Sequence, residues 1–163
     1  MIFSIEFTNK AIERDLKYLA HEHSFYMEPE VKGIWAPWAP RHDFELNLNT
    51  IALGVIDKRI VNVSGFCGLN KSMKSDCEVP AYRKGILKVE NEDLDFGSAF
   101  GIPDVYNHGE FDKYVNLETG WVCIGYPDKP GTAVEFISNC VAVINENNNL
   151  VALWLKPEEL PEL

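Results

Sequence analysis

The sequence lacks most of the short motifs that mark catalytic and cofactor-binding sites. It has no G-x-S-x-G nucleophile turn, no phosphate-binding loop with its lysine and no C-x-x-C pair. Residues 97–101 read GSAFG, but no sign of the helix that a dinucleotide site requires follows them. We therefore predict no catalytic residue, no cofactor and no enzymatic activity.

Cysteine is scarce, and its four positions match no disulfide or metal pattern. Cys123 and Cys140 lie in apolar runs, where a thiol behaves as a small buried hydrophobic side chain. A zinc site would have to combine Cys67 and Cys77 with His42 or His108, at spacings that match no known zinc motif. We predict no metal site, and a reducing compartment as the natural environment of these thiols.

Long hydrophobic runs are also missing. No apolar stretch approaches the ~20 residues that a membrane helix needs. The first ten residues, MIFSIEFTNK, lack the basic start and the apolar core of a secretory signal. We expect a soluble, cytoplasmic protein without a membrane partner.

Basic residues are outnumbered: 15 Lys and Arg face 25 Asp and Glu, so the formal net charge is -10. Binding to nucleic acid depends on clustered Lys and Arg that neutralise phosphates. The charge balance therefore argues against nucleic acid as a direct partner. It fits either a cationic protein partner or simple solubility.

What the sequence does contain is enough apolar material, 46% of 163 residues, for one domain spanning 1–163. Its clearest element is an antiparallel hairpin. The apolar run Val134–Ile144 and the run Leu150–Leu155 flank an Asn-rich turn, Asn147–Asn149. In the second strand Leu150, Ala152 and Trp154 would share one face and Val151, Leu153 and Leu155 the other. Since both faces are apolar, we predict a central strand covered on both sides.

The rest of the chain suggests one helix and several more strands. Ile12, Leu16 and Leu19 recur at helical spacing, so we predict a helix from Asn9 to about His23. Further strands are predicted at Ile2–Phe7, Phe44–Leu48, Ile51–Ile56, Ile60–Val63, Ile86–Val89 and Trp121–Tyr126. We predict an α+β fold, mostly antiparallel β-sheet and compatible with a sandwich, with one N-terminal α-helix.

Residues 90–118 concentrate the acidic charge. Eight acids less one lysine give this segment a formal charge of -7, and five aromatic residues lie among them. Acids can steer a basic partner while aromatic rings supply buried area. The alternative is that the rings belong to the core and the acids are only solvated.

A second candidate surface is the repeat Trp35-Ala36-Pro37-Trp38-Ala39-Pro40. It is a stiff extended connector, and its indoles could instead shield a sheet edge. The predicted partner-binding residues are Asp93, Asp95, Asp104, Tyr106, Glu110, Phe111, Asp112, Trp35 and Trp38.

Two other functions remain open. Trp35, Trp38 and Trp121 could form an exposed row that stacks on sugars, as in a carbohydrate-binding module. His108 could act as a general base with a loop carboxylate in a small hydrolase. His21-Glu22-His23 lacks the one-turn separation of a metalloprotease helix and is better explained as a polar helix end.

A small, acidic protein without catalytic motifs resembles the bacterial immunity proteins that neutralise polymorphic toxins, especially those of contact-dependent growth inhibition. The segment Cys140–Pro157, with Asn147–Asn149 in its turn, is similar to the terminal hairpin of several such proteins. The resemblance implies a cytoplasmic toxin inhibitor whose partner is the cognate toxin C-terminal domain, often a basic RNase or DNase. It further implies that the inhibitor blocks the toxin active site, with its acids standing where the toxin would bind phosphate.

Overall fold

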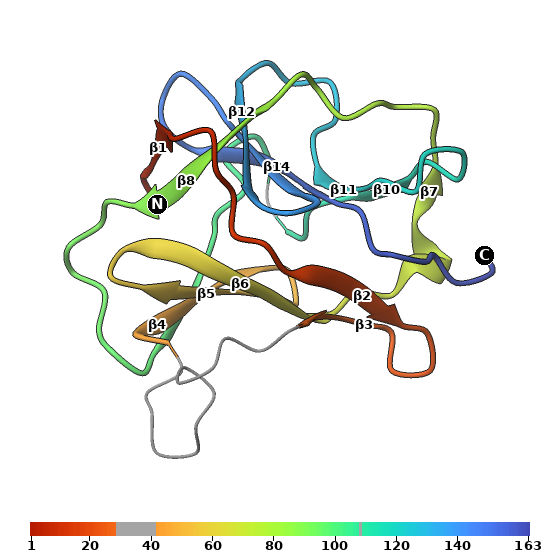
Figure 1. Ribbon diagram of the computed structural model, residues 1–163, viewed down its shortest axis with the longest axis horizontal. Coiled ribbons are helices and arrows are strands. Elements are labelled where there is room, and N and C mark those ends of the chain that lie inside the picture. Colours follow the sequence, from red (N-terminus) through yellow and green to blue (C-terminus); the bar gives the residue numbers. More distant parts are fainter. Residues whose placement is uncertain (29–41, 108) are drawn as a thin grey trace.

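The computed structural model describes residues 1–28, 42–107 and 109–163 (Figure 1). These residues contain fourteen β-strands, a single turn of 3-10 helix and no α-helix. The strands are β1 (Phe3–Phe7), β2 (Asp15–Leu19), β3 (Ser24–Glu28), β4 (Phe44–Leu48), β5 (Ile51–Ile56), β6 (Arg59–Phe66), β7 (Met73–Lys74), β8 (Arg83–Val89), β9 (Ala99–Gly101), β10 (Lys113–Val115), β11 (Val122–Gly125), β12 (Thr132–Ile137), β13 (Cys140–Ile144) and β14 (Leu150–Leu155); the 3-10 turn, η1, is Leu69–Lys71. The predicted α+β class is therefore wrong, and the fold is nearly all β.

The strands form one curled sheet in the order β7-β10-β11-β14-β13-β12-β8-β6-β5-β4-β9. In Figure 1 the strands β10 to β14 form an upper layer above β2 to β6. β8 passes between the layers, because it pairs with β12 at Arg83 and Lys84 and with β6 at Lys88. β1 runs antiparallel to β8 along its whole length, and the β2–β3 hairpin joins the lower layer at the end of β6. The curl brings the two apolar inner faces together.

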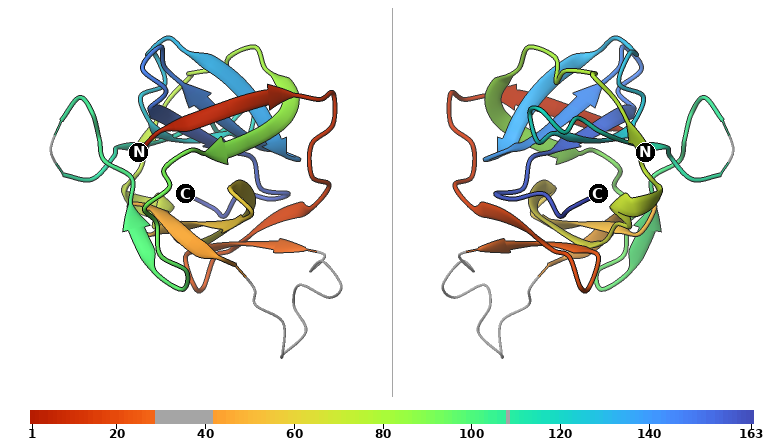
Figure 2. Two further views of the ribbon diagram at one scale, coloured as in Figure 1. Left: turned by 90° about the vertical axis from the view of Figure 1, so that its left-hand side faces the viewer. Right: turned by 90° about the vertical axis from the view of Figure 1, so that its right-hand side faces the viewer.

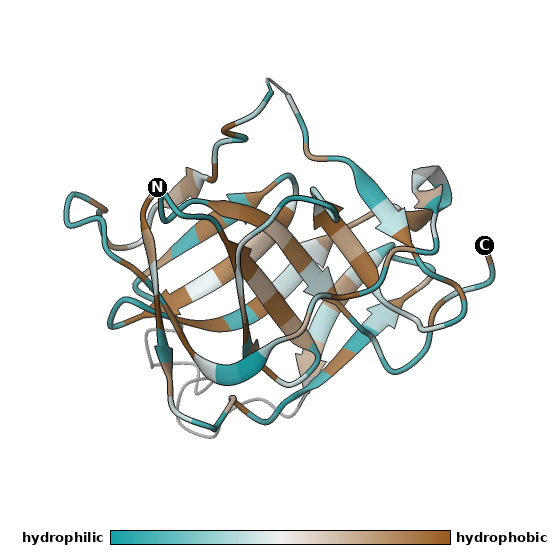
Figure 3. Cartoon of the chain, turned by 90° about the horizontal axis from the view of Figure 1, so that it is seen from above, coloured by the Kyte–Doolittle hydropathy of each residue, from teal (hydrophilic) through white to brown (hydrophobic). Residues whose placement is uncertain are grey.

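The main hydrophobic core fills the space between the layers. It includes Leu46 and Leu53 from the lower layer and Val134 and Leu153 from the upper layer, all at 0% exposure. Seen from above, the strands carry much of the apolar sequence and the connecting loops are largely hydrophilic (Figure 3). At ~1.5–3 kcal/mol for each large apolar side chain, this burial is the main force that holds the curl.

A second, smaller core covers the other face of the upper layer. Trp121, Cys123, Val141 and Trp154 form part of it, and the connector between β7 and β8 packs against it. β14 lies between β11 and β13, and all six of its residues are buried. The prediction that this strand is central and covered on both faces is confirmed.

The predicted division of faces in β14 is wrong at its start. Leu150 belongs to the main core with Leu153 and Leu155, whereas Val151 lies in the second core. The pairing shifts between Val143 and Ile144, where a bulge breaks the strict alternation.

The hairpin across the Asn-rich turn is confirmed as β13 and β14. The apolar run Val134–Ile144, however, is two strands. It divides at Ser138 and Asn139, where a φ of 64° at Asn139 places the backbone in the left-handed region. The strands β12, β13 and β14 therefore form a three-stranded antiparallel meander.

The segment predicted as a helix, Asn9–His23, forms a strand and a turn instead. Its two ends have φ angles of 63° and 51°. Ile12 bonds to β12 in a bridge with Ile137, and Leu16 is buried in the main core together with Phe25 of β3. In β2 the residues Leu16 and Leu19 lie on opposite faces and only Leu16 is buried, so the helical spacing did not describe a common face, and the strand pairing decided the conformation. No helix in the described parts of the chain has the length and apolarity to cross a membrane.

Candidate partner-binding surface

The acids of residues 90–118 lie on three separate connections. Glu90, Glu92, Asp93 and Asp95 are exposed on the β8–β9 connector. Asp104, Glu110 and Asp112 lie on the β9–β10 loop, and Glu118 lies at the turn before β11. The eight acids therefore do not form one continuous group, because the three connections join different strands of the sheet.

Some of these acids have partners within the fold. Glu90 accepts a hydrogen bond from the Ser4 hydroxyl at 2.5 Å, and Glu92 lies 3.5 Å from the Lys58 ammonium. Asp93 and Asp95 form no ion pair with any described residue. The carboxylates of Asp93 and Asp95 are therefore the acidic groups of this connector that a partner can contact.

Phe96 stands at the tip of this connector and is 80% exposed. A turn holds it there: the Ser98 N–H donates to the Asp95 carbonyl at 3.4 Å, and Gly97 has a φ of 77°. A positive φ at the third residue of such a turn favours glycine. The Gly97 N–H also donates to the Asp43 carbonyl at 2.6 Å, which ties the tip to the lower layer.

The β9–β10 loop projects from the body of the molecule (Figure 2). Asp104 organises its base, because its carboxylate accepts from the Tyr106 N–H at 2.9 Å and from the Tyr126 hydroxyl at 2.7 Å. The hydrogen bond to Asp104, aided by burial, raises the pKa of Tyr126 to about 12. The Tyr106 ring meets the Tyr126 ring edge-on at 5.0 Å, and the Lys129 ammonium lies 4.6 Å from the Tyr106 centroid. Neither Tyr126 nor Lys129 was predicted as a site residue, because both are distant from the loop in sequence.

The remaining predicted residues are placed differently. Phe111 is 5% exposed in the main core, and its backbone exchanges two hydrogen bonds with the Asn49 side chain. Phe111 can therefore contact a partner only if the loop moves. Glu110 and Asp112, beside it, are exposed. Trp35, Trp38 and His108 lie outside the described residues. Trp121 is 7% exposed in the second core, so it cannot join a flat exposed row of indoles.

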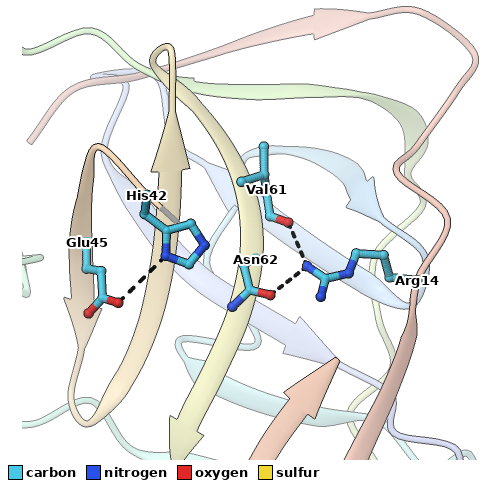
Figure 4. Close-up of polar contacts among 5 residues, drawn as sticks. All are labelled: Arg14, His42, Glu45, Val61 and Asn62. Atoms are coloured by element: carbon cyan, nitrogen blue, oxygen red, sulfur yellow. Dashed lines mark hydrogen bonds and ion pairs between the residues drawn. The ribbon is translucent and has the colours of Figure 1, made fainter. Parts of the chain in front are cut away.

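A polar row crosses the outer face of β4, β5 and β6 (Figure 4). Glu45, Gly54 and Asn62 are cross-strand neighbours, and the His42 ring covers Gly54, where a Cβ atom would lie 2.5 Å from the imidazole. His42 Nδ1 is 3.8 Å from Glu45 Oε1, which is too long for a hydrogen bond. The imidazole therefore lies over Gly54 and near Glu45 without a hydrogen bond between His42 and Glu45.

Arg14 closes the other end of the row. Its buried guanidinium donates to Asn62 Oδ1 at 2.6 Å and to the Val61 carbonyl at 3.2 Å. Val61 and Asn62 lie on the edge of β6 between two paired positions: Arg59, which pairs with β8, and Gly65, which pairs with β3. Arg14 therefore supplies hydrogen-bond donors to a stretch of β6 that pairs with no described strand on this side.

The thiols are spread through the fold. Cys67 is buried in the main core, and Cys123 is buried in the second core. Burial raises the pKa of Cys67 to about 11, which disfavours the thiolate form at neutral pH. Among the residues that the structure places, no three His, Cys, Asp or Glu side chains come together in a way that could hold a metal ion. No protein-family profile matches the chain, and no curated protein matches it.

Proposed function

We propose that the protein is a cytoplasmic immunity protein that binds and neutralises a cognate toxin domain of basic character. The observation that carries the proposal is Phe96, which is 80% exposed beside Asp93 and Asp95. A folded protein gains nothing from leaving so large an apolar side chain in water. A protein interface gains from it, because an aromatic side chain that becomes buried at the centre of a contact is a frequent hot spot.

The charges around Phe96 fit the same role. Asp93 and Asp95 lie two residues apart, with Glu92 next to them and a net charge of -10 on the whole chain. Such a field attracts a basic nuclease domain over a distance of about one Debye length, near 8–10 Å. Asp104 and Tyr106 on the projecting loop give a second acidic and aromatic contact. The acids would take the place of phosphate groups in the toxin active site.

Growth protection tests the proposal. The C-terminal domain encoded by the gene directly upstream is expressed from an inducible promoter, with or without this protein. We expect the domain to stop growth when it is alone, and the two proteins to restore growth and to purify as one complex. A domain that is harmless, or that remains toxic beside full expression of this protein, would contradict the proposal.

A further inference from the structure

β1 lies at an edge of the sheet. Within the described residues it pairs with one strand, β8, and its other side faces away from that pairing. An unpaired edge of a β-sheet presents a row of N–H and C=O groups that another chain can bind. The outer edge of β1 is therefore a candidate interaction surface.

The pairing with β8 fixes which residues face outward. The Glu90 N–H donates to the Ile2 carbonyl at 2.8 Å, and the Thr8 N–H donates to the Lys84 carbonyl at 3.3 Å. In an antiparallel pair, hydrogen-bonded positions alternate with positions that point the other way. The even-numbered residues of this strand thus bond to β8, and Phe3, Ile5 and Phe7 direct their backbone groups to the outer edge.

Little of this outer edge is satisfied within the protein. The Phe3 N–H donates to the Asn148 carbonyl at 2.9 Å. For the backbone groups of Ile5, and for the Phe7 N–H, the described chain supplies no hydrogen-bond partner. Ile5 and Phe7 are both partly exposed. These groups have the spacing that an added strand requires.

One hollow borders the outer edge of β1, and a second hollow adjoins the first. The first, of about 250 Å³, has a mixed lining: the apolar side is Phe3, Ile5, Phe7 and Ile144, and the polar side is Ser4, Thr132, Asn145 and Asn148. The other, of about 500 Å³, extends to Tyr106 and includes Glu146. Both share Thr132, Ile144 and Asn145, so they adjoin each other. In strand addition, main-chain hydrogen bonds give affinity and such hollows receive alternate side chains.

The chemistry of the lining indicates the occupant. The smaller hollow fits a β-branched aliphatic side chain against Ile5 and Ile144. Among the described lining residues of both hollows, Glu146 alone carries a formal charge at neutral pH, and it is negative. We propose that the outer edge of β1 is a strand-addition site for an extended peptide in which basic and β-branched apolar residues alternate. The site does not depend on the proposed toxin partner, because it is defined by the backbone of β1.

The test uses a synthetic nonapeptide of alternating lysine and valine and the full-length protein. Amide exchange followed by NMR is the first readout. The Ile5 and Phe7 amide protons should exchange about tenfold more slowly with saturating peptide, because they become hydrogen-bonded. The Ser4 amide, which already faces β8, should not change.

A pair of variants gives the second readout. Ile5→Pro removes the N–H that points to the outer edge and leaves the β8 pairing intact, which is where an edge strand tolerates proline. Ile5→Ala removes the side chain and keeps the N–H, so it is the matched control. We expect the peptide to bind Ile5→Pro about tenfold more weakly than Ile5→Ala, since hydrogen bonds are lost.

Control peptides separate strand addition from charge attraction. A peptide with glutamate in place of lysine should bind at least tenfold more weakly, and so should a lysine–valine peptide with a central proline. The inference is overturned if the first peptide does not bind at millimolar concentration, if exchange slows elsewhere but not at Ile5 and Phe7, or if the central proline has no effect. The wild-type exchange data decide the matter even if Ile5→Pro fails to fold.

Discussion

Replacing Phe96 by Ala should weaken binding of the toxin domain strongly and leave the fold almost unchanged. A phenylalanine side chain has about 200 Å² of surface that can be buried. Since Phe96 is 80% exposed, about 160 Å² remains for a partner to cover. At about 25 cal/mol per Å² this is worth up to about 4 kcal/mol. The dissociation constant should therefore rise by about 30-fold to 1,000-fold.

The same estimate limits the effect on folding. The buried fifth of the ring is about 40 Å², which contributes at most about 1 kcal/mol to the free energy of unfolding. Phe66, which is 52% exposed on β6, provides a matched control in Phe66→Ala. Isothermal titration calorimetry with the purified toxin domain measures both variants, and urea denaturation checks their stability. Equal affinities for Phe96→Ala, Phe66→Ala and the wild type would refute the assignment of Phe96 as a contact.

Three further predictions concern the fold and the projecting loop. Gly125→Ala should lower the free energy of unfolding by about 2–4 kcal/mol in urea, because φ is 121° and the new Cβ would lie 2.4 Å from the Val151 carbonyl oxygen; a loss below about 1 kcal/mol would contradict this. Asp104→Asn should bring the pKa of Tyr126 from about 12 towards its usual value near 10, as read from tyrosine ¹³C shifts. The raised pKa contributes stability that is complete below pH ~10 and lost as the pH rises to about 12, so stability of the Asn variant should fall less steeply in this window. Arg14→Met should cost about 1–3 kcal/mol in thermal or urea unfolding, because buried acceptors on β6 lose their donor, and an unchanged midpoint would show that Arg14 does not close this edge.

Local patterns in the sequence predicted many of the strands. The strands predicted at Phe44–Leu48 and Ile51–Ile56 match β4 and β5, and the structure joins them by a turn in which Asn49 has a positive φ. The predicted strands Ile51–Ile56 and Ile60–Val63 match β5 and most of β6, and they meet at Asp57 and Lys58, both of which have positive φ. In these hairpins the partner strand is only a few residues away, so the sequence pattern contains most of the information.

The prediction of a helix at residues 9–23 failed although β2 pairs with the nearby β3, because other contacts of the segment are distant in sequence. Residue Ile12 pairs with Ile137, and the Glu158 N–H donates to the Leu16 carbonyl. Nothing within a short window distinguishes this extended path from an amphipathic helix, because Leu16 is apolar in both patterns. The long-range pairs with β12 and the C-terminal segment favour the extended form.

The candidate surface was predictable in composition and not in arrangement. The sequence identified Asp104 and Tyr106, but Tyr126, which positions both, is separated from them by 20 or more residues. Phe111 looks the same as Phe96 in a list of aromatic residues near acids, yet one is 5% exposed and the other 80%. Exposure depends on the curl of the sheet, which no local pattern encodes.

The most direct test of the proposed acidic contact is the association rate constant with the toxin domain, measured by stopped flow at low and high salt. The double variant Asp93→Lys/Asp95→Lys reverses the free charges beside Phe96, and Asp76→Lys/Glu78→Lys makes the same change at two exposed acids on the β7–β8 connector. We predict that the first variant associates about 10-fold to 100-fold more slowly at low salt, that the difference shrinks at high salt, and that the second variant is less affected. Equal rates for the two double variants at low salt would contradict the proposal that the β8–β9 connector receives the partner.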